Sequence, residues 1–370
     1  MPSAKISFFL ATSGHSGVDR AMANLITEIV SRGFQVDQLK VRKHGPHLDI
    51  TSGNFRVVDL GTSHTYTALP ALVRYLRHEH PAVMLSDKDR VNRTTLLAKF
   101  LSRTATRTLL RSGTTLSIDL ANRGRFERWL QKQSIRHLYP NAYQVIVPSH
   151  GAADDMAAFT GLDRSLIRVI PTPIVPDSLF KEHPPRPRHP WFEPGQPPIV
   201  LSVGELGHRK DFPTLLRAFA EVRKNRPCRL IILGRGKQEA RLRQLAADLS
   251  IAHDFLLPGF IERPYAWMAH ADVFAFSSQW EGMPLVLAEA LALGTPVVST
   301  DCPSGPSEIL QRGLYGPLVR VGDHHAMANA IEQMLDNPIP AERLREAARP
   351  YSISLGTNAY LQAMGLGNTP

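Results

Sequence analysis

The stretch EGMPLVLAEALALGTPVVSTDCPSGPSEIL, from Glu281 to Leu310, places two carboxylates, Glu281 and Glu289, eight residues apart. Residues 285–293 around the second carboxylate are apolar on every face of a helix, which is typical of a buried helix. Burying a carboxylate is costly unless its oxygens have hydrogen-bond partners. Two adjacent hydroxyls, such as those of a ribose, would satisfy both oxygens of Glu289, and we expect a ligand of this kind there.

The segments that precede this stretch alternate between short apolar runs and helical patterns. Such alternation predicts a parallel sheet that is covered by helices on both faces. The predicted strands are residues 198–205, 229–234, 254–260 and 272–278, and the helical patterns cover residues 212–225, 236–250 and 263–271. Polar residues that follow these strands would lie at the sheet edge where ligands of such folds bind.

The first half of the chain repeats this organisation. Its predicted strands are residues 5–12, 35–41, 55–60, 82–86, 107–112 and 144–149, and its helical patterns cover residues 18–34, 67–80 and 93–103. The apolar run near the N-terminus leads into a glycine-rich turn and a helix, so we interpret it as the first strand rather than as a signal peptide. We expect no membrane span, because no stretch approaches the roughly 18 uninterrupted apolar residues that one needs.

A proline-dense segment from Pro171 to Pro198 has no clear periodicity and predicts a stiff connector between two domains. The predicted parts are an N-terminal domain of residues 1–175, a linker of residues 176–198, a C-terminal domain of residues 199–350 and a tail of residues 351–370. We expect the tail to pack back on the N-terminal domain. The predicted fold class is α/β, with two doubly wound Rossmann-like domains that face a central cleft.

The charge balance of the chain favours anionic partners. The formal net charge is +10 and the sequence pI is about 9.8. Basic residues are dispersed and belong to no known nucleic-acid module, so we expect no nucleic acid among the partners. Segment 122–139 combines five basic residues with Phe126, Trp129 and Leu130 at helical spacing. Such a helix lies in an anionic membrane interface, or it packs its apolar face on the core and keeps its basic face in water.

The sequence predicts no metal site and no disulfide. Cys228 and Cys302 lie far apart without metal-ligand spacing, and they fit packing residues in a reducing compartment. The one Asp-x-Asp element, Asp87 and Asp89, is interpreted as a turn at the end of a strand.

Several features directly follow the predicted strands of the second half. Arg209 and Lys210 precede a helix, and cations beside a helix N-terminus form an anion site because the backbone amides reinforce them. The other candidates at strand ends, for backbone approach or for stacking of a base, are Gly234, Gly259, Phe260 and Ile261. Simpler interpretations exist for each: a solvated basic turn, glycines that only form turns, and, for Glu281, an acid that begins a helix.

Together, these features resemble glycosyltransferase family 4, a large group of retaining enzymes with the GT-B fold. That family has a glutamate, seven residues and a second glutamate, which Glu281 and Glu289 reproduce. The resemblance covers essentially the whole second half and extends more loosely to residues 13–34. The best-matching segments are residues 202–219, 257–278 and 281–310.

The resemblance implies a role for each matching residue. Glu289 would hold the ribose hydroxyls of a sugar nucleotide, and Glu281 would contact hydroxyls of the donor sugar near the reacting carbon. Lys210 matches the lysine that serves the diphosphate, and Arg209 lies beside it. The catalytic set expected on this basis is Glu281, Arg209 and Lys210. The further donor-binding residues that the resemblance implies are Gly282, Met283 and Leu285, through their backbone amides, and Gly14 and Gly17 in an N-domain loop.

Two positions depart from the family pattern. Glu205 stands where the family usually has an arginine, and an acid cannot serve a diphosphate, so we expect Arg209 to replace that arginine. Gly113 stands where many members have a histidine near the reacting sugar. Either His15 or another group takes the part of that histidine, or activity is impaired.

The predicted function is transfer of a sugar from a nucleotide-diphosphate sugar, with a UDP-sugar favoured, to a hydroxyl of a lipid-linked or cell-surface glycan precursor. The resemblance implies retention of configuration and no metal or other cofactor. We expect a cytoplasmic enzyme, peripheral on the cytoplasmic face of the inner membrane. One alternative is a catalytically impaired GT-B protein that binds a sugar nucleotide as a regulatory or complex subunit. A sugar-nucleotide epimerase is a further alternative, although it fits the motif of the second half poorly.

Overall fold

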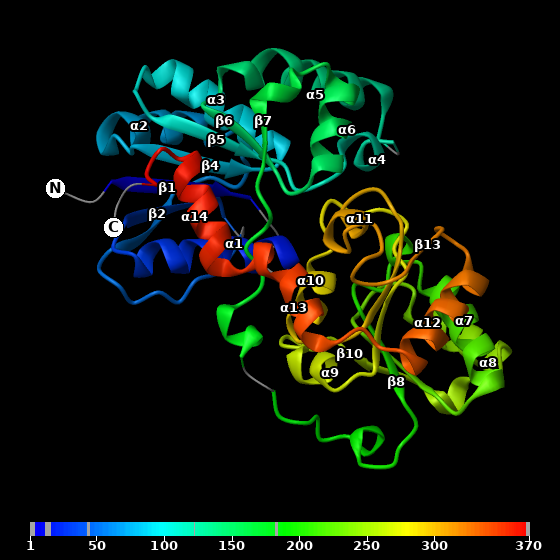
Figure 1. The fold of residues 1–370 in the computed structure, drawn as a ribbon. Coiled ribbons are helices and arrows are strands. Elements are labelled where there is room, and N and C mark those ends of the chain that lie inside the picture. The colour runs from blue at the N-terminus through cyan, green and yellow to red at the C-terminus, as the bar shows by residue number, and fades with distance from the viewer. Residues whose placement is uncertain (1–3, 12–15, 43–44, 122, 182–183, 368–370) are drawn as a thin grey trace. The chain divides into compact units, whose positions relative to one another are not determined.

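Two parallel sheets organise the chain, whose computed structural model describes residues 4–11, 16–42, 45–121, 123–181 and 184–367. Unit 1 comprises residues 1–174 together with residues 351–370, and unit 2 comprises Val175–Pro350. Each unit contains one sheet with helices on both of its faces (Figure 1). This arrangement confirms the predicted α/β class with two doubly wound, Rossmann-like sheets.

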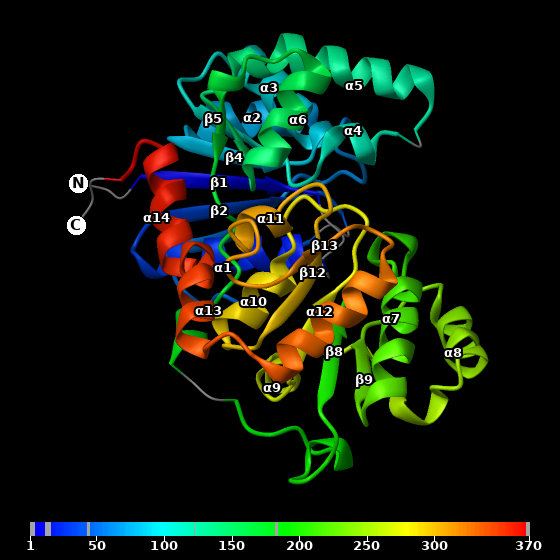
Figure 2. The same cartoon turned by 45° about the vertical axis from the view of Figure 1, so that its right-hand side comes forward.

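The sheet of unit 1 has seven strands in the order β3-β2-β1-β4-β5-β6-β7, and all of its described pairs are parallel. Its strands are β1 (Lys5–Leu10), β2 (Gln35–Lys40), β3 (Phe55–Asp59), β4 (Val83–Asp87), β5 (Arg107–Arg111), β6 (Gln144–Val147) and β7 (Ile167–Val169). Its α-helices are α1 (Gly17–Ser31), α2 (Leu69–Glu79), α3 (Asp89–Ser102), α4 (Leu116–Asp119), α5 (Arg125–Leu138), α6 (His150–Thr160) and α14 (Ile353–Ala363). Helices α1 and α3 lie on opposite faces of the sheet, and α14 lies beside α1 (Figures 1 and 2).

Helix α1 shows how the local sequence starts an element. Ser16 is its N-cap, and Ser16 Oγ accepts a hydrogen bond of 3.2 Å from the Asp19 backbone N–H. The Asp19 side chain accepts a hydrogen bond of 2.9 Å from the Ser16 backbone N–H. This capping box satisfies backbone donors that the first turn leaves open. The buried residues Met22, Leu25 and Ile29 recur at helical spacing and form the apolar face of the helix.

Unit 2 has a sheet of six strands in the order β10-β9-β8-β11-β12-β13. Its strands are β8 (Ile199–Val203), β9 (Arg229–Leu233), β10 (Phe255–Gly259), β11 (Val273–Phe276), β12 (Val297–Thr300) and β13 (Leu318–Val319). Its α-helices are α7 (Phe212–Asn225), α8 (Glu239–Asp248), α9 (Tyr265–Ala269), α10 (Leu285–Ala292), α11 (Pro306–Ile309), α12 (His324–Asp336) and α13 (Ala341–Ala348). Helix α12 lies beside α7 over one face of this sheet (Figure 2).

The proline-rich segment is anchored to unit 2 by aromatic packing. The Phe192 and Trp267 rings meet edge to face with 5.3 Å between their centroids. The Arg229 guanidinium carbon lies 4.5 Å from the centroid of the Trp191 ring. Because these contacts join the segment to β9 and α9, residues 190–192 are held as part of unit 2.

None of the helices in the described part of the chain combines the length and the hydropathy that crossing a membrane requires. Cys228 and Cys302 are buried, and neither takes part in a disulfide. Burial raises the pKa of each thiol to about 12, so both remain protonated at neutral pH.

Candidate active site

The carboxyl ends of β8, β9 and β10 are joined by close approach of glycine backbones. The Gly204 N–H donates to the Leu233 carbonyl at 2.9 Å, and the Gly234 N–H donates to the Gly259 carbonyl at 2.8 Å. A Cβ atom on Gly234 would lie 1.8 Å from the Gly204 oxygen. Gly234 is therefore required for the backbones of neighbouring strands to meet at this edge.

We expect the Gly234→Ala substitution to lower the free energy of unfolding by about 1–3 kcal/mol, because the added methyl group forces the strand ends apart. Chemical denaturation of the full chain measures this loss. Gly53→Ala is the matched control, since nothing lies within 4 Å of an added Cβ there. Equal stability of the two variants would contradict the packing role of Gly234.

The three residues predicted to be catalytic lie together in unit 2. Lys210 Nζ donates to Glu281 Oε1 at 2.8 Å, and Arg209 donates to Glu281 Oε2 at 2.5 Å. Both cations belong to the 3₁₀ turn η5 (His208–Lys210) after β8, whereas Glu281 follows the neighbouring strand β11. Ser278 Oγ also donates to Glu281 Oε1, at 3.0 Å. Adjacent parallel strands thus place two cations and one buried anion at the same edge of the sheet.

Lys210 is positioned more firmly than Arg209. Its ammonium nitrogen lies 4.8 Å from the centroid of the Phe276 ring, and a Cβ on Gly204 would come within 2.8 Å of its Cε atom. The absence of a side chain at Gly204 therefore makes room for the lysine. The Lys210 side chain is 10% exposed, whereas that of Arg209 is 40% exposed. Arg209 is therefore the less restrained of the two cations.

A second loop fixes the backbone between Glu281 and α10. The Glu281 N–H donates to the Pro303 carbonyl at 2.7 Å, and the Ser304 N–H donates to the Glu281 carbonyl at 2.9 Å. A Cβ on Gly305 would lie 2.5 Å from Pro284 Cδ, so this contact also needs a glycine. Of the predicted donor-binding residues here, Gly282 and Met283 are buried and Leu285 is half-buried. The Leu285 N–H donates to the Met283 carbonyl at 3.0 Å in this structure.

Glu289 lies within α10, as the apolar pattern predicts, and is fully buried. The Tyr265 hydroxyl on α9 donates to Glu289 Oε1 at 3.1 Å. A tyrosine thus supplies one of the hydrogen-bond partners that a buried carboxylate needs. Tyr265 is not predicted from the sequence, because its pairing with Glu289 depends on how α9 packs against α10 and not on a local pattern.

The loop after β10 carries Phe260, the aromatic residue predicted to stack on a base. Phe260 is 53% exposed, and the Arg235 guanidinium carbon lies 4.9 Å from the centroid of its ring. Ile261 beside it is half-buried. Because Arg235 follows β9 and Phe260 follows β10, this stacked pair also lies at the carboxyl ends of neighbouring strands.

The structure describes only some of the residues that are expected to contribute to the site from the N-terminal half. Gly14 and His15 lie outside the described residues. Gly17 is exposed at the first position of α1. Gly113 follows β5, and a Cβ on it would lie 3.0 Å from a guanidinium nitrogen of Arg111. A histidine at position 113 would compete with Arg111 for this space.

Arg111 is itself a buried structural residue. It donates to Asp87 Oδ1 at 3.2 Å, to the Tyr360 hydroxyl at 3.1 Å and to Thr172 Oγ1 at 3.2 Å. Tyr360 belongs to α14, so these bonds tie the C-terminal helix to the sheet of unit 1. The second acid of the Asp-x-Asp element, Asp89, forms an ion pair of 2.8 Å with Arg93. Both acids therefore pair with arginines within unit 1.

Comparison with known proteins identifies the class of this fold. The crystal structure of Anabaena HepE in complex with UDP matches this chain with a TM-score of 0.77 and 16% sequence identity. The matched region covers 98% of this chain and 99% of the HepE chain. At this identity the likeness concerns the fold, which is the GT-B fold of glycosyltransferases.

The sequence comparisons identify the family. The model of the glycosyl transferase 4-like domain matches residues 16–173, and the model of the glycosyl transferases group 1 matches residues 186–351. The chain therefore belongs to the group 1 glycosyltransferases.

Two curated relatives illustrate the similarity over the whole chain and over part of it. An N-acetylgalactosamine-N,N'-diacetylbacillosaminyl-diphospho-undecaprenol 4-alpha-N-acetylgalactosaminyltransferase of Campylobacter jejuni is 27% identical over 363 residues, which are 93% of this chain and 92% of the relative. The lipopolysaccharide core biosynthesis glycosyltransferase LpsE of Rhizobium meliloti is 35% identical over 179 residues, which are 46% of this chain and 51% of the relative.

Proposed function

We propose that this chain transfers a sugar from a nucleotide-diphosphate sugar, with a UDP-sugar favoured, to an acceptor hydroxyl with retention of configuration. The cluster of Arg209, Lys210 and Glu281 carries the proposal. It provides two cations for a diphosphate and one acid for sugar hydroxyls at the ligand-binding edge of a doubly wound sheet. HepE, which shares the fold, is solved with UDP-glucose, and this supports a UDP-linked donor.

In the proposed reaction the bond between the anomeric carbon and the β-phosphate oxygen breaks, and the acceptor oxygen bonds to the same face of that carbon. The departing phosphate takes the proton of the acceptor hydroxyl, so the chain need not supply a separate base. Negative charge grows on the β-phosphate as the bond breaks. Lys210 and Arg209 stabilise that charge best if they are already in place before the reaction.

The ion pairs suggest how the site responds to a donor. In the structure described here, Glu281 holds both cations by direct contacts. A diphosphate competes with Glu281 for them, and the more exposed Arg209 is the one that turns toward it. Lys210 stays in place because its ammonium group lies over the Phe276 ring and its aliphatic stem passes close to Gly204. In this proposal, hydroxyls of the donor sugar take the place of Arg209 at Glu281 Oε2.

We further propose that Glu289 accepts hydrogen bonds from the ribose hydroxyls. The Tyr265 hydroxyl donates to one oxygen of Glu289, and a carboxylate accepts hydrogen bonds at about four positions, so this group can receive donors from more than one direction. Since Glu289 is fully buried, a ribose reaches it only when the side chains that cover it move. This proposal therefore includes a local rearrangement around α9 and α10 upon donor binding.

The reaction proposed here needs no bound metal ion, since the two cations of η5 supply positive charge at the diphosphate. Glu205 is exposed, which allows its carboxylate to stay away from the ligand. The alternative of an impaired regulatory subunit is less favoured, because the pairing of Glu281 with Lys210 is intact.

A panel of nucleotide-diphosphate sugars, screened by thermal shift of the full chain, tests the donor. We expect UDP-linked members to raise Tm more than GDP- or ADP-linked ones. The stabilising sugar nucleotides are then incubated with the enzyme, with and without acceptors, and released UDP is measured. Stabilisation without any UDP release would favour the regulatory alternative instead.

For the acceptor we propose a lipid-linked or cell-surface glycan precursor. The name of the Campylobacter relative specifies a diphospho-undecaprenol-linked substrate, and that of LpsE specifies lipopolysaccharide core biosynthesis. Acceptors of this kind lie at a membrane, so the proposal also places the enzyme at the cytoplasmic face of the inner membrane.

Helix α5 supports the membrane part of the proposal. Phe126 is 72% exposed, Trp129 is 55% exposed and Leu130 is 39% exposed, so these side chains are not buried in the core. The residues of α5 that are buried are instead Ser134 and Ile135. Exposed aromatic rings beside basic residues match the composition of interfacial helices.

We expect the full chain to co-sediment with vesicles that contain anionic phospholipid, and the Phe126→Ser, Trp129→Ser double variant to lose most of that binding. Leu314→Ser is the matched control, because Leu314 is 50% exposed but lies in unit 2. Failure of the wild-type chain to bind at low salt, or equal loss in the control, would contradict a role of α5 at the membrane.

A further inference from the structure

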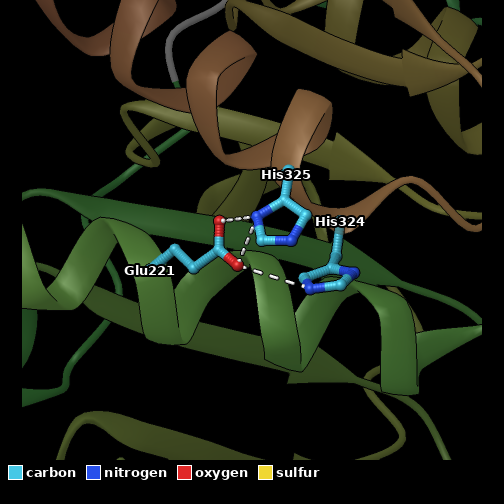
Figure 3. A group of neighbouring side chains, drawn as sticks. All are labelled: Glu221, His324 and His325. Atoms are coloured by element: carbon cyan, nitrogen blue, oxygen red, sulfur yellow. Dashed lines mark hydrogen bonds and ion pairs between the residues drawn. The ribbon is translucent and has the colours of Figure 1, made fainter.

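Two histidines and a glutamate lie together on the surface of unit 2, outside the candidate active site (Figure 3). His324 and His325 are the first two residues of α12, and Glu221 lies on the neighbouring helix α7. Among the described residues, they are the one group of three metal-ligating side chains whose donor atoms all lie within 4.8 Å of one another. Nothing in the proposed transfer reaction uses them.

We propose that these three residues bind a divalent transition-metal ion of the Zn²⁺ class. Two imidazole nitrogens and one carboxylate oxygen form a donor set that Zn²⁺ accepts, and a water molecule can complete a site with three protein ligands. Hard ions such as Mg²⁺ favour oxygen ligands and would bind this set poorly.

The distances between donor atoms fit a tetrahedral ion. Zn–N and Zn–O bonds of about 2.0–2.1 Å place neighbouring ligand atoms of a tetrahedron about 3.3 Å apart. His324 Nε2 lies 3.3 Å from Glu221 Oε1, and His325 Nδ1 lies 2.8 Å from the same oxygen. The two imidazole rings lie side by side with 4.1 Å between their centroids. His325 is 73% exposed, so its side chain has room to rotate and lengthen this contact to the tetrahedral spacing.

The ligands are mounted on helices whose positions the core fixes. Phe219 on α7 and Met327 and Ile331 on α12 belong to one buried cluster. An ion bound by Glu221 and the two histidines would therefore link α7 to α12 and stabilise unit 2. Glu221 lies nine residues after the first residue of α7, about 13 Å along the helix axis, so this structural role is separate from the chemistry at η5.

The test uses the full chain after removal of metals by chelation, with ZnCl₂ as the probe. Calorimetric titration should show one Zn²⁺ bound per chain at this site, and Tm should rise by about 5–10 °C when Zn²⁺ is present at a hundred times its Kd. His324→Ala and Glu221→Gln should each weaken Zn²⁺ binding at least tenfold. Equimolar MgCl₂ should leave Tm unchanged.

His78→Ala is the matched control, because His78 is an exposed histidine whose Nδ1 lies 3.8 Å from Glu79 Oε1. This variant should bind Zn²⁺ as the wild-type chain does. The substituted side chains are at least partly exposed, so Tm without metal should stay within a few degrees of wild type. Absence of Zn²⁺ binding by the wild-type chain, or equal weakening by His324→Ala and His78→Ala, would overturn the proposal and leave an ordinary histidine–glutamate contact.

Discussion

Replacing Lys210 with alanine should lower kcat about 100- to 1,000-fold, the loss typical of removing one preorganised charge-stabilising donor. The ammonium group is fixed by Phe276 and lies 2.8 Å from Glu281 Oε1. It is thus held in one place before charge develops on the β-phosphate. The rate of UDP release from the donor that stabilises the chain measures the effect. Binding of UDP should weaken by less than about tenfold, since the contacts that we propose to the ribose and the base do not involve Lys210.

Two further variants make this prediction specific. Arg209→Ala should lower kcat less than Lys210→Ala, because the 40% exposed arginine is less firmly positioned. Arg217→Ala should leave kcat unchanged, since Arg217 is an exposed arginine of α7 without a place in the cluster. The Lys210 and Arg209 substitutions each remove one cation partner of Glu281, which is 5% exposed. Thermal denaturation of each variant checks that this loss does not destabilise the chain. A Lys210→Ala enzyme that folds normally and keeps more than a third of wild-type turnover would contradict the assigned role.

The fold could be predicted from the sequence because its determinants are local. The apolar run of residues 198–205 and the helical pattern of residues 212–225 correspond to β8 (Ile199–Val203) and α7 (Phe212–Asn225). Alternation of such segments indicates a parallel sheet without knowledge of any long-range contact. The short strand β13 (Leu318–Val319) is not predicted, because two residues are too few to show a period.

The contacts of the site could be predicted only in part. Strand-end position brings Lys210 and Glu281 to one edge, but their direct pairing depends on the order of β8 and β11 in the sheet. Ser278 and Gly204 complete the cluster through contacts that no sequence spacing indicates. The Tyr265 bond to Glu289 joins residues 24 positions apart on two helices. Such partners emerge from packing rather than from periodicity.

Replacing Glu289 with glutamine should weaken UDP binding about 10- to 100-fold, because hydrogen bonds to a charged acceptor contribute about 1.5–3 kcal/mol each. Glutamine keeps the shape of the buried side chain, whereas alanine would leave a cavity in α10 that affects folding as well as binding. We expect Glu289→Ala to weaken UDP binding at least as strongly. Calorimetric titration with UDP measures both variants.

Comparison of UDP with 2'-deoxy-UDP separates recognition of the ribose from general damage to the site. The wild-type chain should prefer UDP about tenfold or more, because the deoxy compound lacks one of the two hydroxyls that we propose Glu289 binds. The preference should fall toward unity in Glu289→Gln and persist in Tyr265→Phe, which removes the phenolic donor but keeps the carboxylate. This difference between ligands does not depend on the stability of each variant, since both are measured on the same protein. If Glu289→Gln discriminates between the two nucleotides as well as the wild-type chain does, Glu289 does not bind the ribose and its burial serves the packing of α9 on α10 alone.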